Sequence, residues 1–599
     1  MCGIAGLVGG GWDDGTARVG RMLDLAAHRG PDGRGCLQRE AVTLGHVRLA
    51  IVDRSHEADQ PMRSEDGQVV IVFNGQIYNH VELRTELERD GWRFRTRSDT
   101  EVLLVAYLAW GRDCLRRFNG MWAFAIADFR LRRVFCARDR FGIKPFMYAH
   151  TSAGFVFASE PKQLLDLLPS RRPDLELIGE FVLSGLLDHH ARRCFEGVQE
   201  LAAGEWMDVG FDGQVADRGR WYSLAAEVAA GGTASAEQFI ERLDDAVSLR
   251  LRADVPVGSC LSGGLDSSSV VASAAPAYAR MGGGRMHAIT AASEDPANDE
   301  SALAQRMAAF AGLEWQVVQP TFDDFAETWD RMHWHQDEPV GGPSLVMQWH
   351  VMKAARAAGL VVMLDGQGGD EVLLGYDRYW PALLRAEVRA HGAAAGLTAL
   401  RALMRNNESM SMQRLAMYAI GGRVAGLRQQ WYSRRARLAV APRIDALRDY
   451  GRNAFEPVAL AITEIERTSL PALLRYEDRN SMAHAVEARL PFLDYRVVQA
   501  GLSLPIRQRS RHGWSKWPLR GASDTRLPPE IRWRRSKLGF NAPERLWLPR
   551  AMSIITSDVL ASKILRELLG RRISDIRSLG ASLVWRLASV ACWERVFRL

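Results

Sequence analysis

Hydrophobic and polar residues alternate in short runs over the first 210 residues of the chain. Many short strands with few helices are typical of an α+β or layered αββα arrangement, not of a βαβ repeat. The spacing of apolar residues at about 80–90 predicts a helix. The β-rich runs, each punctuated by Gly, Asn or Asp, predict strands at 43–53, 68–75, 121–128 and 154–160.

The pattern changes after a stretch of small and polar residues at 213–235, which we expect to be a linker. Beyond it, helical and strand patterns alternate, which predicts parallel strands joined by crossover helices. From about residue 380 the pattern is mostly helical. The expected domains are therefore 1–212 and 236–599. The predicted elements of the second domain are helices 236–252, 267–280 and 300–312 and strands 255–261 and 286–292.

Composition describes an ordinary globular protein of 599 residues, with 47% hydrophobic and 25% charged residues. The net charge of +6 comes from scattered arginines, which argues against a nucleic-acid-binding surface. The 7 cysteines show no paired spacing, which indicates reduced thiols and a cytoplasmic protein. No apolar run approaches the roughly 20 residues that span a bilayer, so no membrane contact is expected.

Candidate chemistry begins at Cys2, in the run MCGIAG. Removal of the initiator Met would leave a thiol and a free α-amine on one residue. Since an α-amine titrates at roughly pH 8, it can act as the general base for its own thiol.

A second candidate site is SCLSGGLDSSS (259–269), between an apolar strand and a helix start. Glycines allow close approach to an anion, while serine hydroxyls and a helix N-terminus supply donors. Asp266 in such a loop implies Mg²⁺, since it would otherwise repel the anion. The loop lacks the GxxxxGK[ST] pattern of γ-phosphate transfer and resembles the loop of ATP pyrophosphatases.

Further motifs extend this resemblance over nearly the whole chain. The N-terminal part contains HRGPD (28–32), GHVRLAIVD (45–53), FNGQIYN (73–79), RSDTE (97–101) and ARDRFGIKP (137–145). The C-terminal part contains LDGQGGDEVLLGY (364–376), RYEDRNSMAHAVEARLPFLD (475–494), SKWPLR (515–520) and RRSKLGFNAP (534–543). Together they resemble the glutamine-dependent asparagine synthetase family. The resemblance implies an Ntn-type αββα glutaminase domain followed by a parallel-sheet, ATP-pyrophosphatase-like synthetase domain with a helical C-terminal part.

For glutamine, the resemblance implies Cys2 as the nucleophile and an oxyanion hole from Asn74 and the Gly75 N–H. Asp99 would bind the α-ammonium, and the α-carboxylate would lie against Arg48, Leu49, Ala50, Ile51 and Val52. Gln76 stands where the family has a glutamate. The lost carboxylate predicts glutamine binding weaker by about 1–3 kcal/mol.

For ATP, the resemblance implies Asp266 and Asp370 as Mg²⁺ ligands and Lys537 as a catalytic lysine. Gln367 and Glu477 belong to the expected acceptor site. Gln367 replaces an acidic residue of the family, and an amide cannot act as a base. The ATP-contacting residues are expected to be Leu261, Ser262, Gly263, Gly264, Asp266, Ser267, Ser268, Asp365 and Gly366.

The expected reaction uses glutamine, ATP and a carboxylate acceptor, and aspartate is the first choice for that acceptor. Two alternatives remain open within this fold: a lasso-peptide cyclase, and an amidotransferase for another carboxylate such as a peptide or sugar acid. A catalytically inactive scaffold is a third. Homodimerisation is possible by analogy with the family.

Two polar segments receive structural interpretations. The HxH in HWHQDEP (333–339) has no further matching ligand, so a structural role is expected. The arginine-rich stretch 421–452 is expected to be a solvated helix face, or else a docking surface for an acidic partner.

Overall fold

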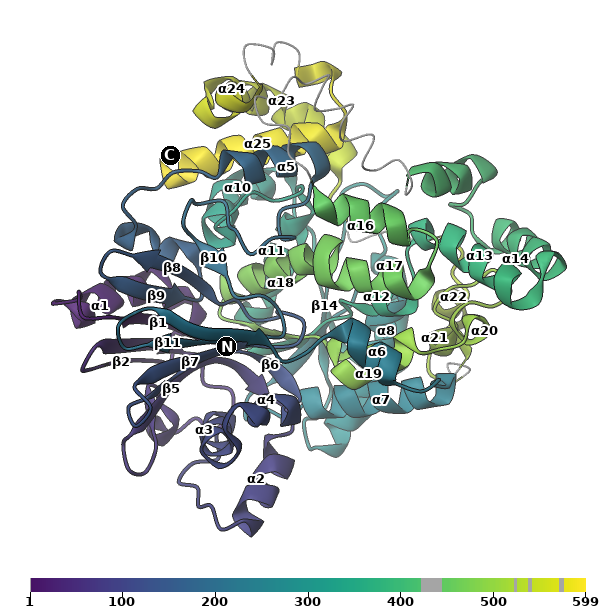
Figure 1. Ribbon diagram of the computed structural model, residues 1–599. Coiled ribbons are helices and arrows are strands. Elements are labelled where there is room, and N and C mark those ends of the chain that lie inside the picture. Colours follow the sequence, from purple (N-terminus) through teal and green to yellow (C-terminus); the bar gives the residue numbers. More distant parts are fainter. Residues whose placement is uncertain (1, 422–443, 522–524, 537–540, 570–575) are drawn as a thin grey trace.

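The computed structural model describes residues 2–421, 444–521, 525–536, 541–569 and 576–599 (Figure 1). Its N-terminal half contains two six-stranded antiparallel sheets, ordered β10-β8-β9-β1-β3-β2 and β12-β11-β7-β6-β5-β4. The first sheet consists of β1 (Gly3–Val8), β2 (Gly33–Arg39), β3 (Val42–Arg48), β8 (Met147–Thr151), β9 (Gly154–Ala158) and β10 (Gln199–Glu200). The second consists of β4 (Met62–Arg63), β5 (Val69–Ile77), β6 (Gly120–Asp128), β7 (Arg133–Arg138), β11 (Glu205–Gly210) and β12 (Val215–Arg220).

The two sheets pack face to face over an apolar core. On β5, Val70 and Val72 belong to the cluster between the sheets, whereas Ile71 and Phe73 belong to the cluster under the outer helices. This alternation follows from the period-2 geometry of a strand that is buried on both faces. Helix α1 (Gly15–Leu25) covers the first sheet, and α3 (Asp99–Trp110) covers the second. The αββα prediction is confirmed.

The linker prediction at 213–235 was wrong for much of its length. Residues Val215–Arg220 form β12, which pairs with β11 at the edge of the second sheet. Residues Leu224–Ala230 form α6, which Ser223 caps by accepting from the Ala226 N–H. The polar composition reflects an edge strand with mostly exposed side chains, since an edge strand need not bury either face.

The C-terminal half is built on a five-stranded parallel sheet of order β15-β14-β13-β16-β17. As expected for parallel strands, helices connect its members. The strand β17 was not predicted, because three residues are too few to show a period. The strands are β13 (Val257–Cys260), β14 (His287–Ala291), β15 (Glu314–Val318), β16 (Val362–Leu364) and β17 (Glu487–Arg489). The helices around them are α7 (Ala236–Arg250), α8 (Leu265–Arg280), α9 (Ser301–Ala311), α10 (Phe322–Gln336), α11 (Ser344–Ala357) and α12 (Gly369–Leu373).

Helices form most of the remaining chain, as predicted. The last helix, α25 (Ala581–Phe597), packs on α10 and also on α5 (Leu175–Ser184) of the N-terminal half (Figure 1). Of the arginine-rich stretch, residues 422–443 lie outside the described residues, and α16 covers Asp445–Asn453. The other helices are α2 (His80–Arg89), α4 (Cys114–Arg117), α13 (Trp380–His391), α14 (Ala393–Asn406), α17 (Pro457–Thr463), α18 (Leu470–Met482), α19 (Tyr495–Leu502), α20 (Ile506–Arg509), α21 (Trp517–Gly521), α22 (Pro529–Arg532), α23 (Glu544–Ala561) and α24 (Lys563–Leu569).

Two further expectations concern membranes and the HxH segment. Within the described ranges, no helix is both long and apolar enough to cross a bilayer. His333 and His335 are buried, and His333 shares a hydrogen bond of 2.8 Å with Ser589 Oγ on α25. This contact is the structural role that the sequence suggested.

Candidate active sites

Cys2 lies directly before β1 of the first sheet and is buried against β5 of the second sheet. Its backbone N–H donates to Asn74 Oδ1 on β5 at 3.1 Å. Burial raises the pKa of the Cys2 thiol, while the Leu49 N–H and the Arg48 guanidinium oppose that rise. The facing sheets thus bring together two residues that are 72 positions apart in the chain.

A small cavity of about 30 Å³ adjoins Cys2. Most of the residues that were predicted to bind the substrate glutamine line this cavity, but Ala50 and Asn74 do not. The Ala50 N–H instead donates to Asp32 Oδ2 of the HRGPD motif. The predicted residues on its wall are Cys2, Arg48, Leu49, Ile51, Val52, Gly75, Gln76 and Asp99, joined by Gln60, Ser98, Thr100 and Glu487 among others.

Asn74 and Gly75 have the features of an oxyanion-binding pair. Asn74 is completely buried, and its Nδ2 has no hydrogen-bond partner among the described residues. A buried donor without a partner is costly, so its presence points to a group that arrives during the reaction. Gly75 is required by close packing, because a Cβ there would lie 2.2 Å from the Met121 carbonyl oxygen.

Gln76 and Asp99 form a hydrogen-bonded pair in the wall of the cavity. Gln76 Nε2 and the Ile77 N–H both donate to Asp99 Oδ2, at 2.9 and 2.8 Å. Arg489 from β17 donates to Gln76 Oε1 at 3.3 Å. An amide suits this place, because it donates to a carboxylate and accepts from a guanidinium at the same time. Burial raises the pKa of Asp99.

Arg48 is already held by neighbouring acceptors. Its Nη1 donates to the Ser55 carbonyl and to Asp59 Oδ1, both at 2.7 Å, and its Nη2 donates to the Asp53 carbonyl. These bonds fix the guanidinium at the cavity. A glutamine carboxylate would therefore have to share an Arg48 that these groups already orient.

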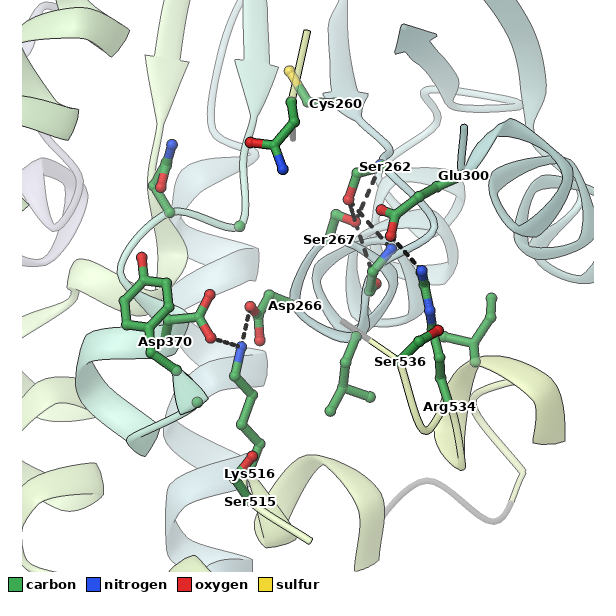
Figure 2. Close-up of a pocket in the computed structure, with 18 of the residues that line it drawn as sticks. Cys260, Ser262, Asp266, Ser267, Glu300, Asp370, Ser515, Lys516, Arg534 and Ser536 are labelled. Carbon is green, nitrogen blue, oxygen red and sulfur yellow. Dashed lines mark hydrogen bonds and ion pairs between the residues drawn. The ribbon is translucent and has the colours of Figure 1, made fainter. Parts of the chain in front are cut away.

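A larger cavity, of about 470 Å³, opens beyond the carboxyl ends of β13 and β16 (Figure 2). This is where ligands bind in open parallel sheets. Among the predicted residues, Gly263, Ser268 and Glu477 do not line it. Those that do are Leu261, Ser262, Gly264, Asp266, Ser267, Asp365, Gly366, Gln367 and Asp370.

The SGGLDSS loop is organised by its own hydroxyl groups. Ser262 Oγ lies 3.0 Å from Ser267 Oγ and accepts from the Gly264 N–H at 3.2 Å. Gly263 has φ +75°, and a Cβ there would lie 2.7 Å from the Ala304 amide nitrogen of α9. Glycine is therefore needed at 263 for conformation and packing. The helix α8 begins at Leu265, within this motif, so its N-terminal N–H groups would face an anion bound there.

Asp266 and Asp370 converge on one cation, the Lys516 ammonium (Figure 2). Lys516 Nζ lies 2.7 Å from Asp370 Oδ1 and also pairs with Asp266 Oδ2. Although burial disfavours its charge, the two carboxylates raise the pKa of Lys516. Two carboxylates close enough to share one ammonium also fit a Mg²⁺ ion, which prefers oxygen ligands.

The acceptor residues Gln367 and Glu477 do not share one surface. Gln367 lines the cavity, whereas Glu477 of α18 is buried behind it and accepts from Gln348 Nε2. Burial and then the nearby Asp365 raise the pKa of Glu477 well above its ordinary value. Burial also raises the pKa of Asp365, to about 6. The buried Oε1 of Glu477 has no partner among the described residues.

Lys537 lies outside the described residues. Arg534, Ser536 and Asn541, on either side of that gap, line the cavity, and Arg534 pairs with Glu300 (Figure 2).

Sequence reasoning gave Arg29, Glu487 and Arg489 no part in the glutaminase site, although each lies in a motif it had quoted. Arg29 Nε donates to the Cys2 carbonyl at 3.0 Å, and Glu487 lines the Cys2 cavity from the C-terminal half. Their membership in HRGPD and VEARLPFLD was the available signal. Their meeting at Cys2 required the three-dimensional structure.

The two halves together define a glutamine amidotransferase joined to an ATP-using synthetase. Comparison with known families agrees: the glutamine amidotransferase domain matches residues 1–222, and asparagine synthase matches residues 238–593. The chain belongs to the asparagine synthase family. It is an ATP-dependent ligase that uses glutamine as its nitrogen donor.

Similar proteins span nearly the same length. Asparagine synthetase [glutamine-hydrolyzing] 1 of Bacillus subtilis is 28% identical over 578 residues, which cover 92% of this chain and 89% of that one. A putative asparagine synthetase [glutamine-hydrolyzing] of Mycobacterium tuberculosis is 30% identical over 615 residues, with coverages of 92% and 88%. An amidase of Penicillium rubens is 28% identical over 577 residues, with coverages of 88% and 84%.

Proposed function

We propose that this protein converts a carboxylate into a carboxamide, with ammonia from glutamine and activation by ATP. Cys2 Sγ attacks the glutamine δ-carbonyl carbon, ammonia leaves, and water hydrolyses the thioester to glutamate. In the other half, the acceptor carboxylate attacks the α-phosphorus of ATP and pyrophosphate leaves. Ammonia then attacks the acyl adenylate, which yields the amide and AMP.

In the glutaminase half, Cys2 acts with its own α-amine as base once Met1 is removed. Asn74 Nδ2 and the Gly75 N–H stabilise the oxyanion, and Asp99 binds the glutamine ammonium. The unpartnered, buried Nδ2 of Asn74 supports this assignment. At about 30 Å³ the cavity is large enough for only a water or two, so glutamine entry requires its walls to move.

In the synthetase half, the SGGLDSS loop and the start of α8 bind the ATP phosphates. Asp266 and Asp370 would hold Mg²⁺, which would neutralise phosphate charge. Lys516 neutralises charge on the same two carboxylates. Lys537 is proposed to act on the pyrophosphate.

One helix carries the coupling between the halves, and this observation supports the proposal most strongly. Asp478 on α18 binds Arg29, whose Nε holds the Cys2 carbonyl. The preceding residue on the same helix is Glu477, and Tyr476 lines the ATP cavity. This helix thus links Cys2 to the larger cavity through a few buried, charged contacts.

Aspartate is the acceptor to be tested first, and a larger carboxylate such as a peptide side chain is the second candidate. Free aspartate needs a cation for its α-carboxylate. The described cations that line the cavity are already engaged, by carboxylates or backbone carbonyls: Lys516, Arg520, Arg534 and Arg535. The neutral Gln367 also favours the second candidate.

Pyrophosphate release separates these possibilities. Wild type and Cys2→Ala are each incubated with ATP, Mg²⁺ and aspartate, with either glutamine or ammonium as nitrogen source. Asparagine from both sources with wild type, but only from ammonium with Cys2→Ala, supports the proposal with aspartate as acceptor.

Failure at each half gives a different result. Glutamate formation without aspartate-dependent pyrophosphate rejects aspartate alone and directs the search to peptide carboxylates. Absence of glutamine hydrolysis in wild type rejects the role of Cys2. Asparagine from glutamine with Cys2→Ala would do the same.

A further inference from the structure

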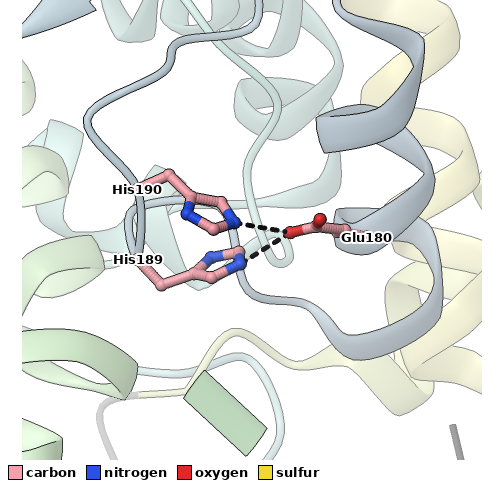
Figure 3. Close-up of side chains that lie close together, drawn as sticks. All are labelled: Glu180, His189 and His190. Atoms are coloured by element: carbon pink, nitrogen blue, oxygen red, sulfur yellow. Dashed lines mark hydrogen bonds and ion pairs between the residues drawn. The ribbon is translucent and has the colours of Figure 1, made fainter. Parts of the chain in front are cut away.

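Three metal-binding side chains converge away from both cavities described above. Glu180 lies on α5, and His189 and His190 lie in the loop that follows it (Figure 3). His189 Nε2 and His190 Nε2 lie 2.7 and 3.2 Å from the same atom, Glu180 Oε2. Figure 3 shows both rings directed at that carboxylate.

These distances suit a tetrahedral metal. With metal–ligand bonds of about 2.0–2.1 Å, neighbouring ligand atoms in such a site lie about 3.3 Å apart. All three ligand atoms lie within 4.8 Å of one another. A metal among them would need the His189–Glu180 separation to widen by about 0.6 Å and the His190–Glu180 separation by about 0.1 Å.

The surroundings provide an open coordination position. A cavity of about 260 Å³ is lined by His189 and His190, by Asp188, and by Glu466 and Arg467 of the C-terminal half. Water in this cavity can complete the coordination. Metal binding at His189 Nε2 would move the ring proton from Nε2, where Glu180 accepts it, to Nδ1, which has no competing partner among the described residues.

We propose that Glu180, His189 and His190 bind a borderline divalent transition metal, Zn²⁺ in the first instance, with water as the fourth ligand. Two imidazoles and one carboxylate with an open position suit Zn²⁺ better than Mg²⁺, which prefers an all-oxygen shell. The Mg²⁺ proposed for the ATP cavity is therefore not a competitor for this site.

The metal would fix a loop that supports the synthetase half. Asp188, next to His189, accepts from Arg475 Nε of α18 at 2.9 Å and from Arg193 Nη2 at 2.7 Å. Arg475 directly precedes Tyr476, which lines the ATP cavity. Metal binding thus restrains the loop at the joint between the halves without touching either proposed site of chemistry.

The test measures metal bound to the full chain. Chelator-treated protein is incubated with Zn²⁺ or Co²⁺, separated from free metal, and analysed for metal content and for Co²⁺ absorption. About one equivalent should remain on wild type, and it should be lost in Glu180→Gln, His189→Ala and His190→Ala. X-ray absorption of the zinc form should show nitrogen and oxygen ligands at about 2.0 Å and no sulfur at about 2.3 Å.

His287→Ala is the matched control, since His287 forms an isolated pair with Glu314 at 2.9 Å and should leave metal content unchanged. Glutamine hydrolysis in each variant reports that the chain has folded. Wild type that retains less than about a tenth of an equivalent overturns the proposal. So does metal that folded His189→Ala or His190→Ala still retains, or a sulfur ligand in the spectrum.

Discussion

Arg29 and Asp478 form a buried, bidentate ion pair that joins the N-terminal and C-terminal halves of the protein. Arg29 Nη1 donates to Asp478 Oδ2 at 2.9 Å, and Nη2 donates to Oδ1 at 3.1 Å. The same guanidinium donates to Glu160 and to the Cys2 carbonyl. Because Asp478 lies on α18, this pair joins Cys2 to the helix that borders the larger cavity.

Asp478→Asn should destabilise the protein and uncouple its two reactions. Removing one charge from a buried pair typically costs about 3–5 kcal/mol, because its partner stays buried. Urea unfolding measures the loss, and the ratio of glutamate to pyrophosphate measures uncoupling. We expect that ratio to rise. A free energy of unfolding within about 1 kcal/mol of wild type, with an unchanged ratio, would contradict the structural importance of this pair.

Gln76→Glu should tighten glutamine binding. A carboxylate at 76 would repel Asp99 in the empty site and attract the glutamine ammonium once it is bound. One charge-assisted hydrogen bond is worth about 1–3 kcal/mol, so KM for glutamine should fall by about tenfold. Gln214→Glu, on an exposed turn, adds the same charge elsewhere and should leave KM unchanged. An increased KM in Gln76→Glu would show that Asp99 does not receive the ammonium.

Asn74→Ala should lower kcat for glutamine hydrolysis with little change in KM. Loss of one oxyanion donor typically reduces kcat by about 10²–10³-fold. Steady-state glutamate formation measures both constants. Ammonium-dependent pyrophosphate release should persist, which shows that the other half remains intact. A kcat reduced less than about threefold would remove Asn74 from the oxyanion hole.

Lys516→Met should make stability depend on Mg²⁺. Without the ammonium, Asp266 and Asp370 repel each other, so melting in EDTA should occur at a lower temperature than in wild type. Mg²⁺ should raise that temperature more in the variant than in wild type, because the ion replaces the lost charge. Lys563→Met, at an exposed lysine, is the control. Equal Mg²⁺ responses would argue against a metal between the two aspartates.

Asp365→Asn should stabilise the protein near pH 7.5. Burial raises the folded-state pKa of Asp365 to about 6, whereas the unfolded value is about 3.9. The folded state therefore binds more protons between these values, and this residue lowers stability as pH rises from about 4 to 6. The variant should gain about 3 kcal/mol at pH 7.5 and nothing near pH 4. Urea unfolding at both pH values checks this, and an equal gain at both would contradict the titration.

Local sequence patterns were sufficient for most elements and for the loops that meet the ligands. The apolar run in 68–75 predicted β5, because both faces of that strand are buried, and SGGLDSS between strand and helix predicted the proposed anion loop. The linker prediction failed because an edge strand such as β12 has a polar composition. The placement of Ala50 and Glu477 also differed from expectation, since motif membership does not state which way a side chain points.

The sequence by itself indicated the proposed nucleophile, the proposed anion loop and the two-part architecture, because these depend on residues close together in the chain. Only the tertiary structure decided which distant groups meet. It places Glu487 at the Cys2 cavity, Lys516 between Asp266 and Asp370, and Arg29 against Asp478. Such contacts arise when separate layers pack to bury apolar surface, and the buried charges then pair because an unpaired charge there is costly.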